Sequence, residues 1–242
     1  MIKRIFIALV LVMLAAMFLD LAASYRENTS LSPLGRYYAD TGPAELGAAN
    51  LVTSVVVTYR GLDTLGEVTV LFISAAGVGL MLRRERKKGG DNGGENGDAR
   101  MRIHRPASEI VETATELLLP MVILFGIYVF LNGHLSPGGG FQGGAIIASG
   151  TMFLLLALPE SHISRLLISI MESLSGFSYV VVGVLGVILA GGFLDNRIMG
   201  LGTFGSLFSA GAIPIIYVFV GIKVGFELSA VLDRFREDSD AT

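Results

Sequence analysis

The sequence predicts an all-α integral membrane protein with about seven transmembrane helices in a 3 + 4 arrangement. Of the 242 residues, 52% are hydrophobic and 16% are charged, whereas soluble domains carry about 25% charged residues. Apolar runs recur along the chain, several of them near the roughly 20 residues that cross a bilayer core. Eight of the 18 lysines and arginines fall between Arg83 and Arg105 and divide these runs into two groups.

The first group occupies residues 1–83. Residues 2–23 form an apolar run long enough to span a membrane. Its Lys3-Arg4 start also resembles a signal peptide, but a retained helix is expected because the run is longer than a usual signal core. Residues 25–43 are polar and predict an extramembrane loop. Residues 46–59 are apolar but short and rich in hydrogen-bonding side chains, so the span expected there should face protein or a cavity. Residues 64–82 are the third span.

The third span begins with a charged group. Arg60, Asp63 and Glu67 are close in sequence, and the two acids, four residues apart, share a helical face. Asp63 is expected to cap the helix and is also a candidate for the ion or proton path. Glu67 lies deeper, and a carboxylate near hydrocarbon is costly and marks ion or proton routes. The alternative for Glu67 is that it only complements the positive N-terminal end of the helix.

A basic, glycine-rich linker at residues 84–106 separates the two groups. Its middle is a flexible Gly/Asp/Asn tract. Basic ends of this kind also occur in nucleic-acid binders, but between membrane spans the positive-inside tendency explains them, and no nucleic-acid partner is expected. The linker and the C-terminus are therefore expected in the cytoplasm, and three preceding spans place the N-terminus outside. An external Lys3-Arg4 pair contradicts the positive-inside tendency, but the linker has more basic residues and is expected to determine the orientation.

The second group occupies residues 107–242 and holds four expected spans, at residues 113–131, 140–158, 177–194 and 209–232. Residues 159–175 mix charges with leucine and isoleucine and predict an amphipathic helix at the membrane surface. The chain is thus expected as a three-helix module (1–83), the linker (84–106) and a four-helix module (107–242).

Four charged side chains of the second module are candidates for an ion or proton path. Glu112 and Glu116 share a face entering the fourth span, and Glu116 precedes Pro120, which opens the local hydrogen-bond ladder. Lys223 and Glu227 are one turn apart within the last span and suit an intramembrane pair. The alternatives are an interfacial first turn for the acids and snorkelling to the interface for the pair.

A glycine-rich turn connects the fourth and fifth spans. Pro137 ends helical structure, the glycines that follow allow tight turns, and Gly140 and Gly144 have the spacing that lets another helix approach closely. A flexible hairpin loop is the alternative, and His134, a polar side chain in this turn, is a candidate for the ion or proton path. The candidate packing residues are Pro137, Gly138, Gly139, Gly140, Gln142, Gly143 and Gly144.

Nucleotide binding is disfavoured at this turn. Its glycines match the spacing G-x-G-x-x-G, but that fingerprint requires a short strand before it and a soluble βαβ unit around it, and no Lys-Ser/Thr pair of a P-loop follows. The chain has no cysteine, and His104, His134 and His162 are too far apart to suggest a metal site. No catalytic residue, resident cofactor or metal is therefore expected in this chain.

Two stretches resemble one known family. Residues 137–144, Pro-Gly-Gly-Gly-Phe-Gln-Gly-Gly, with the helix before them, look like the B subunit of Mrp-type multisubunit sodium/proton antiporters. Residues 50–67, Asn-Leu-Val-Thr-Ser-Val-Val-Val-Thr-Tyr-Arg-Gly-Leu-Asp-Thr-Leu-Gly-Glu, resemble the carboxy-terminal membrane region of the large A subunit. In this sequence that region is expected without the large antiporter-like portion that precedes it in the A subunit. Such an arrangement is similar to that of complex I-related membrane-bound hydrogenases and sulfane reductases.

The resemblance implies a membrane subunit of a Na⁺/H⁺ translocation module in the cell membrane, with other Mrp-type subunits as partners and Na⁺ and H⁺ as transported ions. Carried onto this chain, Glu67 and Glu116 would lie in the ion path. A redox-driven, hydrogenase-like complex is favoured over a stand-alone antiporter, and in that case the chain would be a subunit of a membrane-bound oxidoreductase. A purely structural scaffold subunit is the alternative from another class. An independent transporter is disfavoured because the halves show no inverted repeat.

Overall fold

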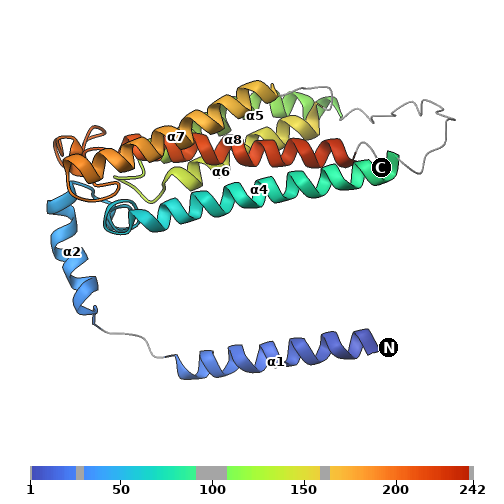
Figure 1. Cartoon of the computed structure of the whole chain (residues 1–242), viewed down its shortest axis with the longest axis horizontal. Coiled ribbons are helices and arrows are strands. Elements are labelled where there is room, and N and C mark those ends of the chain that lie inside the picture. The colour runs from blue at the N-terminus through green and yellow to red at the C-terminus, as the bar shows by residue number, and fades with distance from the viewer. Residues whose placement is uncertain (1, 26–29, 91–107, 159–163, 240–242) are drawn as a thin grey trace. The chain divides into compact units, whose positions relative to one another are not determined.

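The computed structural model describes residues 2–25, 30–90, 108–158 and 164–239. All regular structure in these ranges is helical, which confirms the all-α class (Figure 1). The chain divides into two compact units, Met1–Tyr37 and Tyr38–Thr242. Each unit is described by itself.

The first unit contains one long helix, α1 (Ile2–Ser24), whose described side chains are almost all exposed. A second helix, α2 (Pro33–Leu46), begins in the first unit and ends in the second. Pro33 suits the first helical position, where no backbone N–H is needed, and the Ser32 hydroxyl accepts a hydrogen bond from the Gly35 N–H at 3.1 Å. The expected loop at residues 25–43 is therefore helical over its second half.

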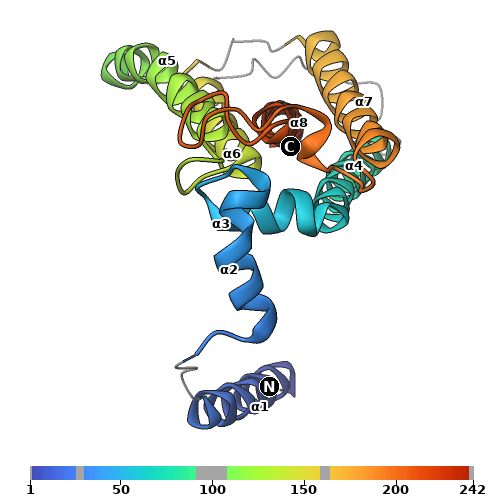
Figure 2. The same cartoon turned by 90° about the vertical axis from the view of Figure 1, so that its left-hand side faces the viewer.

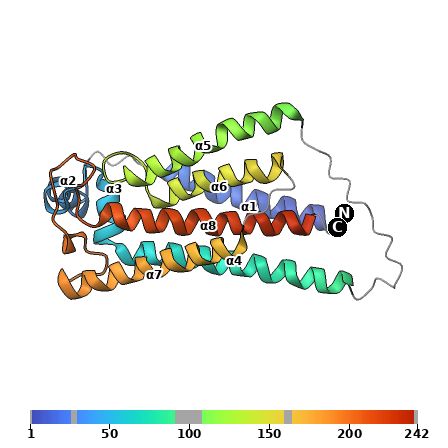
Figure 3. The same ribbon diagram turned by 90° about the horizontal axis from the view of Figure 1, so that it is seen from above.

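The second unit is a bundle built around one central helix. Its long helices are α4 (Gly61–Gly90), α5 (Glu109–Leu131), α6 (Gly140–Ala157), α7 (Arg165–Leu189) and α8 (Ile213–Ser239). Helix α8 contacts all four of the others. Seen end-on, it lies at the centre, with α5 and α6 on one side and α4 and α7 on the other (Figures 2 and 3).

Six described helices are long and apolar enough to cross a membrane: Lys3–Ser24, Gly61–Leu82, Glu109–Leu131, Gly140–Ala157, Arg165–Leu189 and Ile213–Arg236. Within the most apolar part of the α8 span 56% of the residues are buried, against 11% for α4. The polar side chains Lys223, Glu227 and Ser229 of α8 are among the buried ones and are enclosed by protein. An integral membrane protein is confirmed, with six rather than seven such helices in the described ranges.

The span expected at residues 46–59 is wrong. This stretch forms a short turn of α-helix, α3 (Leu51–Thr53), followed by a π-helix, η1 (Ser54–Tyr59). The two pieces together are far shorter than the roughly 20 residues that a membrane crossing needs. The polar side chains that made this stretch unusual bond to the turn between α5 and α6: the Asn50 Nδ2 donates to the carbonyls of Gly133 and Ser136 at 2.8 and 2.9 Å.

The surface helix expected at residues 159–175 is also wrong over its described part. From Arg165 onward the chain is one continuous helix, α7, that passes through the predicted boundary near residue 176 and ends at Leu189. Ser164 starts it, since its hydroxyl accepts a hydrogen bond from the Leu167 N–H at 3.3 Å. The charge at Glu172 does not hold this helix at the surface because it pairs inside the bundle.

Residues 91–107, which contain most of the predicted linker and His104, lie outside the described residues, as does His162. Of residues 84–90 the structure describes the backbone, which continues α4. The division into modules at the linker remains a prediction. Helices from both sides of it pack together, because α4 contacts α8.

Candidate functional site

Three charged side chains meet inside the bundle and form the candidate site. Glu172 projects from α7, and Lys223 and Glu227 project from successive turns of α8. The Lys223 Nζ lies 3.0 Å from Glu172 Oε1 and 3.0 Å from Glu227 Oε2. We call these three residues the triad. Its position is set by the helical repeat, which places residues four apart on one face of α8, and by the direct packing of α7 on α8.

The two carboxylates of the triad have different surroundings. The Glu227 side chain is 1% exposed, and neither of its oxygens makes a hydrogen bond, since the Lys223 contact has the distance but not the direction of one. The Glu172 side chain is 22% exposed, and its Oε1 accepts a hydrogen bond from Lys223. A buried carboxylate without a hydrogen-bonding partner is costly, so Glu227 depends on the Lys223 charge or on a bound proton.

An open groove of about 290 Å³ between α4 and α7 leads to the triad. Glu172 and Lys223 line it together with the hydroxyl residues Thr69 and Ser173. The Lys223 Nζ also lies 5.0 Å from the centroid of the Phe72 ring, within cation–π range. Lys223 is therefore held by α7 through Glu172 and by α4 through Phe72, and the groove between these two helices gives the triad an approach from outside the bundle.

The acids expected at the start of the third span lie on the outside of α4. Asp63 is in the first helical turn rather than at the cap, and it pairs with Arg60 at 2.5 Å with both side chains more than half exposed. Glu67, one turn deeper, is exposed too, although its charge acts on the hydroxyls of Tyr179 and Tyr217. Glu67 is thus within electrostatic reach of the bundle interior but is not enclosed by it.

The acids of the fourth span are also peripheral. Glu112 is half-buried and Glu116 is exposed, both on α5. Helices α5 and α4 lie on opposite sides of α8 (Figure 2), so the structure does not bring Glu116 and Glu67 together. Of the seven predicted ion-path residues, only Lys223 and Glu227 meet at one buried site.

The glycine-rich turn holds together segments that are far apart in sequence. The Thr53 hydroxyl donates to the Gly133 carbonyl at 2.7 Å and accepts a hydrogen bond from the Tyr217 hydroxyl at 2.9 Å. The backbone carbonyl of His134 accepts from the Asn50 N–H at 3.0 Å. These bonds join the α5–α6 turn to α3 and to α8, so the turn is a fixed element.

His134 is fully buried within this turn. Its Nε2 lies 3.3 Å from the Ser206 carbonyl, and its Nδ1 has no hydrogen-bonding partner. Burial lowers the pKa of His134 below its ordinary value of 6.5, although the backbone carbonyls of Ser206, Leu131 and Leu207 act in the opposite direction. The imidazole is therefore held in its neutral form. The Ser206 contact gives it a role in joining two loops.

Glycines of the turn lie where helices touch. A Cβ atom at Gly140 would lie 2.7 Å from the Val220 Cβ, and one at Gly144 would lie 2.7 Å from the Gly221 carbonyl oxygen, both on α8. A Cβ at Gly143 would meet the Gly126 carbonyl oxygen of α5 at 2.6 Å. The other predicted packing residues are less enclosed: Gly139 is buried, Gly138 is half-buried, and Pro137 and Gln142 are exposed.

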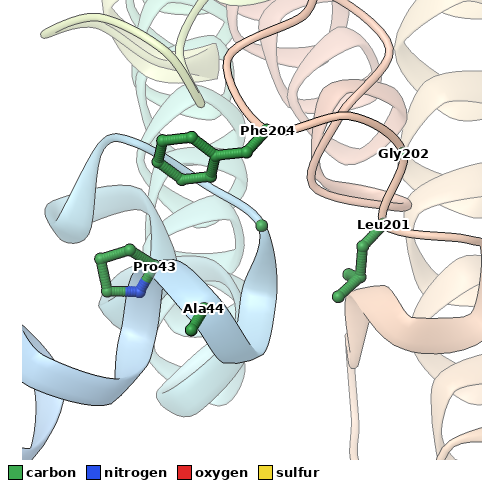
Figure 4. Close-up of a pocket in the computed structure, with 6 residues that line it drawn as sticks. Pro43, Ala44, Leu201, Gly202 and Phe204 are labelled. Carbon is green, nitrogen blue, oxygen red and sulfur yellow. The ribbon is translucent and has the colours of Figure 1, made fainter.

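A second open cavity, of about 330 Å³, lies at the loop end of the bundle and has no charged lining (Figure 4). Its lining residues are Pro43, Ala44, Gly47, Leu201, Gly202 and Phe204. Nothing in this lining can bind or transfer an ion. We therefore place the candidate site at the triad and not in this cavity.

One further charged group lies in the loop between α7 and α8. Arg197 makes three hydrogen bonds to the Asp195 carboxylate and lies 3.6 Å from Glu45. Burial acts to raise the pKa of Asp195, but the hydrogen bonds and charge of Arg197 hold it below its ordinary value. The Asp195 side chain also accepts from the Arg197 N–H and so starts the short 3₁₀ helix η2 (Asn196–Ile198). This group is structural.

No metal site is evident where the structure describes the chain, since no three His, Asp or Glu side chains converge there. The triad has only two carboxylates, and an ammonium group lies between them. The chemistry that it can perform is the uptake and transfer of protons.

Comparison with known families agrees with this arrangement. The model for a domain related to the MnhB subunit of the Na⁺/H⁺ antiporter matches residues 110–230, half of the chain. A protein of Methanocaldococcus jannaschii is 30% identical over 196 residues, 72% of each chain. The chain belongs to the MnhB-related family. Residues 3–91 match a second model, named MbhE, which describes one of the subunits of MBH.

Two solved structures have the same fold as this MnhB-related chain. In the membrane-bound sulfane sulfur reductase, an archaeal respiratory membrane complex, one chain is 37% identical with a TM-score of 0.77, and the match covers 97% of this chain and 98% of that one. In the Mrp complex from Dietzia, a chain is 25% identical with a TM-score of 0.74, and the match covers 96% of this chain but 26% of that one.

Shorter matches join the MnhB-related chain to named antiporter subunits. The B subunit of a Bacillus subtilis Na⁺/H⁺ antiporter is 47% identical over 58 residues, which are 41% of that protein. The probable A/B subunit of a Rhizobium meliloti K⁺/H⁺ antiporter is 31% identical over 141 residues, and the match covers 13% of its length. The resemblance to the Mrp family predicted from residues 50–67 and 137–144 is confirmed.

Glu172 is the member of the triad that sequence reasoning missed. The stretch around it is rich in leucine and isoleucine but also contains charged residues, namely Glu160, Arg165 and Glu172. This pattern is typical of a surface helix. The length of unbroken helix-forming sequence after Arg165 is a signal that the segment continues as one span. The pairing with Lys223, 51 residues away, has no signal in a single sequence.

Proposed function

We propose that this chain is a membrane subunit of an Mrp-type Na⁺/H⁺ translocation module within a complex I-related, redox-driven complex. The observation that carries the proposal is the near-complete match with a chain of the sulfane sulfur reductase, at 97% and 98% coverage. The Mrp match covers only 26% of its partner chain. The match to a chain of the respiratory complex along nearly its whole length supports this complex over the stand-alone antiporter.

In this proposal other subunits supply the redox chemistry and the chain contributes to ion movement. A lysine and two glutamates buried within spanning helices are costly and indicate such a role. Glu67 and Glu116, exposed on the outside of α4 and α5, would face neighbouring subunits of the complex. We propose that Asp63 and Glu112 lie along the same approaches, and that His134 and the glycine-rich turn have a structural role.

The proposal includes an orientation. Helix α4 leads from the glycine-turn end of the bundle toward the linker, and α8 runs in the same direction. The linker and the C-terminus would lie on the cytoplasmic side because of the basic residues. With six crossings instead of seven, the N-terminus and Lys3-Arg4 fall on that side too, which removes the conflict created by an external N-terminus.

The test is purification of the intact complex from its native membrane, with identification of every subunit. We expect metal-cluster subunits together with Mrp-type membrane subunits. Mrp-type subunits alone would indicate a stand-alone antiporter instead. If the chain were isolated alone and folded, the subunit proposal would be overturned.

The second candidate function is a purely structural scaffold, which the close glycine contacts between α6 and α8 favour. Substitution of Glu67 distinguishes ion transport from this scaffold role. In vesicles holding the assembled complex, Glu67→Gln should reduce Na⁺-dependent H⁺ movement by about tenfold or more. Glu109→Gln, an exposed acid in the first turn of α5, is the matched control and should transport normally. Normal transport by both Glu67→Gln and Glu116→Gln would favour the scaffold.

A further inference from the structure

The charge balance of the triad points to a proton-binding unit. With all three groups ionised, two carboxylates and one ammonium leave one negative charge inside the bundle. An uncompensated buried charge is costly, so uptake of one proton by either glutamate makes the triad neutral. The Arg234 guanidinium on α8 also acts on Glu227, but it donates to the Ala75 carbonyl on α4 at 3.1 Å and is not in contact with the triad.

In the described part of the chain, the charged groups that act on Glu227 are Lys223, Glu172 and Arg234. The face that α6 presents to α8 near this level consists of Gly144, Ile147 and Thr151. Helix α4 contributes Phe72 and Ala75. The protonation of Glu227 therefore depends on its burial and then on the charges of Lys223 and Glu172, its partners in the triad.

The triad has an open end and a closed end. Glu172 lines the groove between α4 and α7 and is 22% exposed, so it is the member of the triad that a proton donor outside the bundle can reach. Glu227 is 1% exposed, and both of its oxygens are enclosed without hydrogen-bonding partners. Lys223 lines the groove and lies 3.0 Å from Glu227 Oε2, so it connects the groove to Glu227.

The Lys223 ammonium also determines which ion the triad carries. Its Nζ lies 3.0 Å from an oxygen of each carboxylate, which is the position that a cation held by both glutamates would take. A sodium ion there would be repelled by the ammonium charge at close range. The transferable ion is therefore a proton.

Resting on the function proposed above, we propose that Glu172, Lys223 and Glu227 form a proton-loading unit in which Glu172 is the entry and Lys223 the relay. In the loading step, Lys223 Nζ gives a proton to Glu227 Oε2 and takes the proton carried by Glu172. One N–H bond and one O–H bond break, and one of each forms. Lys223 is an ammonium before and after the step, the negative charge passes from Glu227 to Glu172, and the net charge of the triad is zero in both states.

Infrared difference spectroscopy on the purified complex tests this unit without relying on transport. A pH change at constant Na⁺ should reveal a buried carboxylic acid in the wild type, and Glu227→Gln should remove its signal. Glu172→Gln leaves Lys223 and Glu227 as a neutral pair, so Glu227 should stay ionised and the carboxylic acid signal should be lost in this variant as well. Glu109→Gln is the control and should leave the signal unchanged, while Glu227→Asp should restore it in part.

The same variants in proteoliposomes, with a pH-indicator dye, give the transport readout. Glu227→Gln and Glu172→Gln should each reduce H⁺ movement by about tenfold or more. Wild-type infrared signals in both variants, or a signal that follows Na⁺ at constant pH, would overturn the proton-loading unit and leave the proposed function standing. A wild-type complex that moves no ions would overturn the proposed function, and the infrared result would still decide the unit. Should Glu227→Gln fail to assemble, Glu172→Gln decides.

Discussion

At the scale of single residues, position within the bundle matters more than chemical type. Glu67 and Glu227 are both glutamates inside spanning helices, yet one is exposed and the other is 1% exposed and paired with Lys223. The burial cost of a carboxylate depends on its partners. Lys223 and Glu227 were predictable from their spacing of four residues, whereas their third partner was not.

The buried imidazole of His134 leads to a prediction about pH. Because burial holds its folded pKa below 6.5, the unfolded chain binds more protons than the folded one as the pH falls through 6.5 and below. Stability is therefore fully present above about pH 6.5 and is lost toward acid. Between about pH 7.5 and about pH 5.5 we expect the thermal unfolding midpoint of the purified complex to fall by a few degrees on this account.

The variant His134→Gln is the comparison for this effect. It removes the titrating group and keeps a side-chain donor for the Ser206 carbonyl, which lies 3.3 Å from the histidine Nε2. Its midpoint should depend less on pH than that of the wild type. Equal pH dependence in the two proteins would show that His134 does not contribute.

At the scale of helices, close packing around α8 depends on the absence of side chains. A Cβ at Gly144 would lie 2.7 Å from the Gly221 carbonyl oxygen and 2.8 Å from the Val224 Cβ. Backbone cannot move out of the way as the end of a flexible side chain can. Helices α6 and α8 would have to separate to admit even a methyl group.

The variant Gly144→Ala should therefore destabilise the bundle by about 1–3 kcal/mol, the usual cost of overpacking. Gly77→Ala is the matched control, because a Cβ at Gly77 on α4 meets nothing within 4 Å, and its effect should stay within about 0.5 kcal/mol. Thermal unfolding in detergent, followed by circular dichroism, measures both. Similar losses in the two variants would mean that close approach at Gly144 is not what stabilises the pair.

Sequence reasoning succeeded for helices whose limits are set locally. Helix α6 begins at Gly140, three residues after Pro137, and ends one residue before its predicted limit. It failed where a contact between residues far apart in the sequence determines the structure. Residues 46–59 have the composition of a short span, but Asn50 bonds the α5–α6 turn and keeps them at the bundle end. Glu172 has the sequence context of an interfacial residue because its counter-charge is on another helix.

At the scale of the whole molecule, the number of crossings determines which ends of the chain share a side of the membrane. Six described helices are suited to cross. In the proposed orientation these six helices all cross, and both termini lie on the same side. The chain has no cysteine, so single cysteines can be introduced as reporters without removing any native one.

Labelling with a membrane-impermeant maleimide tests this arrangement. Lys3→Cys and Ser108→Cys should react from the cytoplasmic side, and Phe208→Cys, at an exposed position in the loop between α7 and α8, should react from the opposite side. Inverted vesicles expose the cytoplasmic side of the membrane to the reagent, and right-side-out vesicles expose the opposite side. Reaction of Lys3→Cys and Phe208→Cys from the same side would indicate that the chain crosses the membrane seven times.

The hydrogen bonds of Thr53 have a consequence for how such proteins are assembled from genes. Thr53 lies in the part that matches the MbhE model, and its partners Gly133 and Tyr217 lie in the MnhB-related part. With α4 also packed on α8, the interface between the two parts exists whether or not a peptide joins them. The covalent connection only raises their effective concentration. Two polypeptides split between these parts should find each other in the membrane, so gene fusion and gene fission would be neutral for the fold.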